Sequence, residues 1–161
     1  TSDTQRSIGW KQDVLSPCAG KIVRMVSSQK DKQELKFFKD LMSDYRSIKF
    51  DKNSNEFHVV FGNYVIIESD GYFCLLAHLK EGSMQFSVGD EVNVGDKLAE
   101  IGHNGSSKMP HLHFQLMDSA DLKVATGLPV CFDIKAEVRR QWNKIEYCVP
   151  AIGVRIKSLD R

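Results

Sequence analysis

Proline and long apolar runs are both scarce in this chain of 161 residues. Four prolines stand among 42% apolar and 27% charged residues, a balance that excludes a disordered chain and a low-complexity polymer. The longest apolar runs, such as residues 64–67 and 73–77, are far too short to cross a bilayer, so no membrane span is expected. The length suits one hydrophobic core, and we expect a single domain over residues 1–161.

An excess of positive or negative charge is also missing. The 22 basic and 21 acidic residues give a net charge of +1, and no stretch gathers lysines and arginines into a basic stripe. Nucleic acid is therefore not an expected partner. The first ten residues lack the charged start and apolar middle of a secretory signal, which leaves two alternatives open: a cytosolic chain, or a mature fragment whose leader has been removed.

The four cysteines form no closely spaced pair. They are Cys18, Cys74, Cys131 and Cys148. Structural zinc sites and thioredoxin-like redox sites need such pairs, so both are excluded. We expect the cysteines to act as small buried hydrophobic residues, although an even number would also permit two disulfides.

Short strand patterns separated by glycine turns fill most of the chain. The branched and alternating segments predict strands at residues 21–27, 56–61, 64–68, 72–78, 111–117, 130–134 and 152–156. The step Asp70-Gly71 favours a tight turn, so the strands on either side of it are predicted to form a hairpin. Many short strands at regular spacing predict a mainly β fold, an antiparallel sandwich or barrel.

One segment has a helical period instead. Between residues 32 and 45 apolar side chains recur at steps of three and four with charges between them, namely Leu35, Phe38, Leu41, Met42 and Tyr45. This stripe is typical of an amphipathic helix, and its neighbours alternate as strands do. We therefore expect a short helical insertion at the rim of the β core.

The motif PHLHF places His111 and His113 two residues apart in a predicted strand. Alternation along a strand sends both imidazoles to one face, where their nitrogens suit zinc with one coordination position left for water. Taken alone, the pair is equally compatible with two incidental strand histidines. A third histidine, His78, ends the apolar run YFCLLAHL, where it is either a hydrogen-bonded strand-end residue or part of a site.

The order of these motifs resembles the lysostaphin-type, or LytM-like, zinc endopeptidases. The chain reads GNYVIIESDGYFCLLAHL from residue 62, then VGDEVNVGDKLAEIGHNG, then PHLHFQL. The resemblance runs from about residue 15, where SPCAGKIV is similar to the family's opening strand, to about residue 117, and residues 118–161 would be a C-terminal extension. It implies a duplicated-hybrid-motif-like β fold, location outside the cytoplasm or in the cell envelope, and a cell-wall peptide as substrate.

The resemblance also assigns roles to the histidines. It implies that His113 binds zinc, while His78 and His111 assist catalysis. The family supplies two further zinc ligands upstream, a histidine and an aspartate four residues later. An ungapped count places Thr1 and Gln5 there, whereas an insertion of two residues places Asp3 at the aspartate position and the histidine before the first residue. The zinc site read from this sequence is therefore incomplete.

Two histidines and two alternative functions remain. We expect His58, in EFHVVF, to be structural or on the surface, and His103 to lie in a solvated turn. The incomplete ligand set favours a degenerate, non-catalytic binding or regulatory module as the alternative to an enzyme. A carrier or phosphotransfer domain is a weaker alternative, because a phosphoryl acceptor needs no pair of histidines and no lysine stands in a Met-Lys-Met setting.

Overall fold

A computed structural model describes residues 2–35, 57–138, 140–150, 155–157 and 159. The chain divides into two compact units, residues 1–127 and residues 128–161. The expectation of a single domain stays a prediction. Within the described residues, no helix is long and apolar enough to span a membrane.

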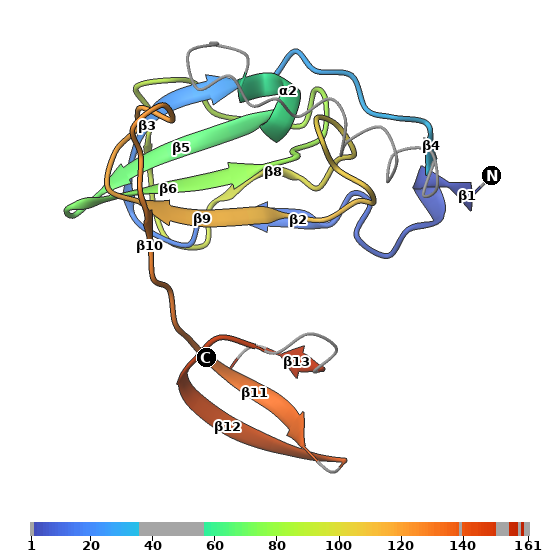
Figure 1. The fold of residues 1–161 in the computed structure, drawn as a ribbon, viewed down its shortest axis with the longest axis vertical. Helices are drawn as coiled ribbons and strands as arrows, with labels where there is room; N and C mark the ends of the chain where they lie inside the picture. Colours follow the sequence, from blue (N-terminus) through green and yellow to red (C-terminus); the bar gives the residue numbers. More distant parts are fainter. Residues whose placement is uncertain (1, 36–56, 139, 151–154, 158, 160–161) are drawn as a thin grey trace. The chain divides into compact units, whose positions relative to one another are not determined.

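A sheet of six strands forms the centre of the first unit (Figure 1). Its order is β10 (Gly127–Leu128), β9 (His113–Met117), β6 (Tyr72–Ala77), β5 (Tyr64–Ser69), β3 (Gly20–Val26) and β7 (Glu91–Val92). Two further pairs are β2 (Asp13–Leu15) with β8 (Lys97–Glu100), and β1 (Ser2–Asp3) with β4 (Glu34–Leu35). A single 3-10 turn, η1 (Thr4–Arg6), follows β1. The strand pairings recorded for the first unit are antiparallel, which confirms the predicted fold class.

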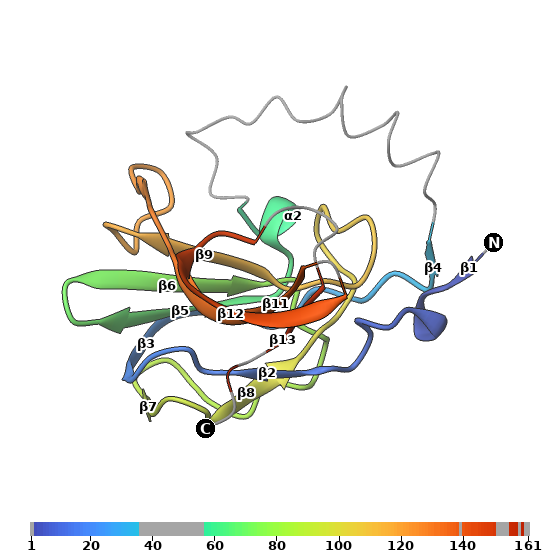
Figure 2. The same cartoon turned by 90° about the horizontal axis from the view of Figure 1, so that it is seen from below.

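The central strands bury both of their faces. One face packs against β2 and β8, and this core cluster includes Val14, Ile67, Leu76, Leu98 and Ala99. The opposite face carries a second cluster with α2 (Phe57–Phe61) and the loop before β10, to which Tyr64, Ile66, Leu75, Met117 and Phe61 belong. Figure 2 shows α2 on one side of the sheet and the β2–β8 pair on the other. Because both faces are covered, strands such as β5 are almost continuously apolar rather than alternating.

The predicted hairpin is confirmed. Strands β5 and β6 pair along their whole length, from Tyr64 opposite Ala77 to Ser69 opposite Tyr72. Gly71 takes a φ of +79°, a left-handed conformation that glycine adopts without steric penalty. The predicted strand at residues 21–27 is also confirmed as β3.

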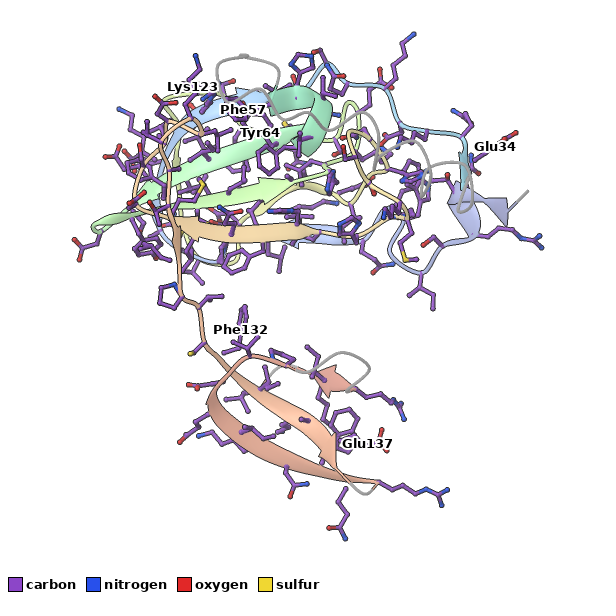
Figure 3. The ribbon with its side chains drawn as sticks, viewed as in Figure 1. Glu34, Phe57, Tyr64, Lys123, Phe132 and Glu137 are labelled. Atoms are coloured by element: carbon purple, nitrogen blue, oxygen red, sulfur yellow. The ribbon has the colours of Figure 1, made fainter. Side chains whose placement is uncertain are left out.

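The strand predicted at residues 56–61 is wrong, because Phe57–Phe61 form the helix α2. Residues four apart share one helix face, and this spacing turns both phenylalanines toward the sheet, where Phe57 is buried and Phe61 packs beside Tyr64. Figure 3 labels Phe57, at the start of α2, and Tyr64, at the start of β5. Gly62, with a φ of +63°, donates its N–H to the His58 carbonyl and ends the helix. Tertiary packing thus overrides the strand propensity of the valines.

The predicted helical insertion lies largely outside the described residues. Only its first four residues, 32–35, are described, and they are not helical. Glu34 and Leu35 form β4, which pairs with Asp3 and Ser2.

The second unit is a small antiparallel sheet. Its order is β12 (Gln141–Cys148), β11 (Phe132–Val138) and β13 (Ile156–Lys157). Ile134 and Ala136 are buried on one face. On β12, Trp142 is partly exposed and the Lys157 ammonium lies 4.5 Å from the centre of its ring.

Candidate active site

His78 lies directly after β6 in a strained backbone conformation. Its φ is +61°, although it is not a glycine. Its N–H donates to the Phe61 carbonyl at 3.0 Å, and its carbonyl accepts the Gly102 N–H at 2.8 Å. Left-handed residues with a side chain cost energy and cluster at functional sites. Hydrogen bonds to Phe61, at the end of α2, and to Gly102, in the loop after β8, therefore hold His78 in a conformation that it would not adopt alone.

The His78 imidazole is buried and fixed in one tautomer. Its Nδ1 lies 3.0 Å from the Asn104 carbonyl oxygen, which can only accept, so Nδ1 carries the proton and Nε2 is left with its lone pair. Burial, together with the nearby His111 and His113 rings, lowers the pKa of His78 to about 3 from its ordinary value of 6.5. The ring is therefore neutral near neutral pH.

His111 lies beside His78 but outside β9, although the predicted strand began at this residue. The strand begins at His113, so the alternation argument for a pair on one face is wrong for His111. The turn before the strand brings the ring into place instead: His111 Nδ1 donates to the Met109 carbonyl at 2.7 Å, and Ser107 Oγ donates to the same oxygen at 2.7 Å. The His111 and His78 rings are 4.7 Å apart, centre to centre. His111 is exposed and, like His78, has its Nε2 free of the backbone bond.

His113 opens β9 and is half-buried. Its ring centre lies 6.0 Å from that of His78 and 5.3 Å from that of Phe61, edge to face in both cases. Its Nε2 lies 3.3 Å from Gln115 Oε1, an acceptor, so Nε2 carries the proton and Nδ1 carries the lone pair. Metal-ligating histidines donate their other N–H to such a partner, and this arrangement suits His113 as a ligand.

The loop that holds the histidines is a buried polar network. His103 is fully buried, with 0% exposure, so the predicted solvated turn is wrong. Its Nδ1 lies 3.2 Å from Ser107 Oγ. Asn104 is buried as well, and its side chain joins the Asn63 N–H at 2.8 Å to the Leu79 carbonyl at 2.7 Å. These bonds satisfy groups whose burial would otherwise be costly.

The N-terminal segment, which contains Asp3, packs on the same region. Gly9 touches the carbonyl of Pro110, the residue before His111, so closely that a Cβ on Gly9 would lie 2.3 Å from that oxygen. Asp3 pairs with Glu34 through the backbone, and its side chain lies outside the part that the structure describes. Its predicted role as a zinc ligand stays a prediction. Among the described residues, no group of three or more histidines, cysteines or acidic residues is placed to hold a metal ion.

The structure thus brings three predicted site residues together and adds others. His78, His111 and His113 form one cluster, whereas His58 lies on α2 and is partly exposed, in line with a structural or surface role. Sequence reasoning missed Asn63 and Asn104, which hold the loops behind His78. The Gly-Asn and His-Asn-Gly steps around them were visible signals of special backbone geometry.

Two sequence comparisons find similar proteins. Residues 48–126 match the family model described as Peptidase family M23, a stretch that includes all three clustered histidines and excludes Asp3. Endolysin 2638A of Staphylococcus phage 2638A is 33% identical over 87 residues, which cover 52% of this chain and 18% of the endolysin. The chain therefore spans less than a fifth of the length of this relative.

Three solved structures are also similar. A mutant catalytic domain of the prophage-encoded M23 protein EnpA from Enterococcus faecalis has a TM-score of 0.48 and 16% identity over 74% of this chain and 69% of that one. The catalytic domain of the antimicrobial peptidase lysostaphin from Staphylococcus simulans has a TM-score of 0.47 and 23% identity, with the same coverage. A zinc-containing peptidase from Vibrio cholerae has a TM-score of 0.46 and 21% identity over 73% of this chain and 26% of its own.

Proposed function

The chain belongs to peptidase family M23, the lysostaphin-type or LytM-like peptidases, and on this premise we propose that it is a zinc-dependent endopeptidase acting on peptide cross-links of the bacterial cell wall. The substrate is a cell-wall peptide, and its site of action is the cell envelope. The matched relative is a phage endolysin, which supports this substrate class.

The observation that carries the proposal is the cluster of three imidazoles with assigned tautomers. His78 and His111 each donate Nδ1–H to a main-chain carbonyl and keep Nε2 as a proton acceptor. After accepting a proton, either ring presents an N–H that can stabilise negative charge on the oxygen of a scissile carbonyl. The strained backbone at His78 and its burial support a role in chemistry rather than in packing.

The donor chemistry of the cluster fits zinc, which neutral imidazole binds readily. We assign His113 and Asp3 as zinc ligands, because Gln115 leaves His113 Nδ1 with its lone pair and because an insertion of two residues aligns Asp3 with the aspartate ligand of the family. When bound, zinc would polarise the scissile carbonyl and lower the pKa of a bound water. His78 and His111 accept and donate protons, while the bond to Gln115 holds the His113 ring in the ligating orientation.

A second candidate function is a binding or regulatory module that keeps the fold without catalysis. The specific observation in its favour is that the described residues supply no group of three metal ligands. Two protein ligands hold zinc weakly, so this chain should bind zinc poorly if Asp3 and His113 are its only ligands.

Alanine variants of the histidines separate the two functions. We expect His113→Ala to abolish both zinc binding and cleavage of glycine-containing cell-wall peptides. His78→Ala and His111→Ala should keep the zinc affinity of the parent and lose about a hundredfold or more in activity. His58→Ala is the matched control and should change neither. A parent protein that is inert toward these peptides with zinc added would favour the binding module.

A further inference from the structure

The Asp31 carboxylate, between β3 and β4, binds two stretches of chain next to His78: the loop of residues 103–104 and the segment that follows His78 in the sequence. Asp31 Oδ1 accepts the His103 N–H at 2.6 Å and the Asn104 side-chain amide at 2.8 Å, and Oδ2 accepts the Glu81 N–H at 2.9 Å. Charge-assisted bonds of this length are about twice as strong as neutral ones. Asp31 therefore joins the loop under the His78 ring to the segment that follows His78.

Asn104 transmits this arrangement to the His78 ring. Its side-chain amide donates both to Asp31 and to the carbonyl of Leu79, the residue after His78. Its main-chain carbonyl accepts Nδ1–H of the ring. One residue, oriented by Asp31, thus fixes both the backbone beside His78 and the proton on its imidazole.

The neighbours of Asp31 hold the same loop. Lys32 donates its N–H to the His103 carbonyl at 2.7 Å and its ammonium to the Ser107 carbonyl at 3.1 Å. Gly102 approaches Asp31 so closely that an added Cβ would lie 2.6 Å from Oδ1. The carboxylate is therefore packed against the backbone of this loop.

We propose that Asp31 is a positioning residue for the candidate active site: through Asn104 it holds the His78 imidazole in the Nδ1–H tautomer, with Nε2 directed to chemistry. The effect of Asp31 on the reaction rate rests on the proposed function, whereas its effect on the His78 tautomer does not. A carboxylate that merely staples two loops would affect stability, whereas a positioning residue also determines which ring nitrogen carries the proton.

The tautomer can be measured without metal or substrate. We would record nitrogen NMR spectra of the histidine rings in the metal-free chain near neutral pH. Parent His78 should show one protonated and one bare nitrogen. In Asp31→Asn, an amide NH₂ replaces one acceptor and faces an N–H donor, so the Asn104 loop loosens and the two His78 nitrogen signals should converge as both tautomers become populated.

Asp96→Asn is the matched control, because Asp96 caps its own turn by accepting the Asn93 N–H at 2.7 Å. This variant replaces a carboxylate that caps a turn outside the His103 loop, and it should keep the parent His78 spectrum. In assays with zinc, Asp31→Asn should lower kcat about tenfold or more with little change in KM. An inactive parent would count against the proposed function only, since the spectra would still test Asp31.

A folded Asp31→Asn variant with the parent His78 spectrum would overturn the proposal, and so would a parent in which Nδ1 is bare. If Asp31→Asn does not fold, Asn104→Ala serves in its place. That variant keeps the main-chain carbonyl and removes the amide that reaches Asp31, so it should show the same convergence. An unchanged spectrum in that variant would also refute the inference.

Discussion

The buried, neutral His78 predicts a measurable acid sensitivity of folding. The perturbation is His78→Asn, which removes the titrating ring. Asparagine is among the few residues that tolerate the left-handed conformation present there, so the backbone should survive the substitution. The lost hydrogen bond to the Asn104 carbonyl lowers stability by an amount that does not depend on pH, provided that His78 stays neutral.

The lowered pKa of His78 determines whether acid stabilises or destabilises the fold. His78 has a pKa of about 3 in the folded chain against 6.5 for an unperturbed histidine, so between these two values the unfolded chain binds one more proton. The stability contributed by the neutral ring is complete above the unfolded pKa and is lost as pH falls toward 3. Each pH unit in this window removes about 1.4 kcal/mol, which amounts to about 2.5 kcal/mol between pH ~7 and pH ~4.5.

Urea unfolding of the metal-free chain at a series of pH values measures this loss. The free energy of unfolding of the parent should fall more steeply with acid than that of His78→Asn, by about 2.5 kcal/mol over that window. Titrating groups that do not interact with His78 are common to both proteins and cancel in the difference. Parallel pH profiles would refute the reasoning, because they would mean that His78 titrates alike in the folded and unfolded chains.

Two further predictions concern glycine strain and thiol accessibility. Gly62→Ala should destabilise the fold by about 2–4 kcal/mol in urea unfolding, because the position is left-handed and the new Cβ would lie 2.0 Å from Asn104 Oδ1. Gly71 is also left-handed but lies in open space, so Gly71→Ala should lower the free energy of unfolding by only about 1 kcal/mol. Equal losses in the two variants would contradict the packing argument. Burial raises the pKa of the Cys74 thiol, and the neighbouring Cys18 raises it further, whereas Cys131 is exposed. A thiol reagent followed by peptide mass mapping should therefore label Cys131 in the native protein and Cys74 only after unfolding, and native labelling of Cys74 would show that its site opens.

Local patterns predicted the β architecture well. The Asp-Gly step set the β5–β6 hairpin, and the Gly-Asp turns at residues 89–90 and 95–96 precede β7 and β8. In both turns the aspartate accepts an N–H three residues earlier, at 2.8 Å from Ser87 and at 2.7 Å from Asn93. Such features depend on residues adjacent in the sequence, which is why the sequence is sufficient to predict them.

The same holds for the motifs that carry the candidate site. His78, His111 and His113 were identified from AHL and HLH, and they do form one cluster. The mechanism of their convergence was not predicted correctly, because His111 reaches the cluster through a turn rather than by alternation along a strand. The motifs were sufficient to identify the three histidines, whereas the orientation of the His111 ring depends on its hydrogen bond to the Met109 carbonyl.

What the tertiary structure alone decided is the environment of these rings. Burial of His103 and the role of Asp31 depend on a hydrogen bond between residues 72 positions apart, and no local pattern reports such a contact. The helix α2 likewise replaces a predicted strand because the helical turn buries Phe57 and packs Phe61 beside Tyr64. Sequence by itself therefore determined which residues could do chemistry and most of the strands beside them. Packing between distant segments decided the burial, tautomers and strain of those residues, because these properties arise only from neighbours that the folded chain brings together.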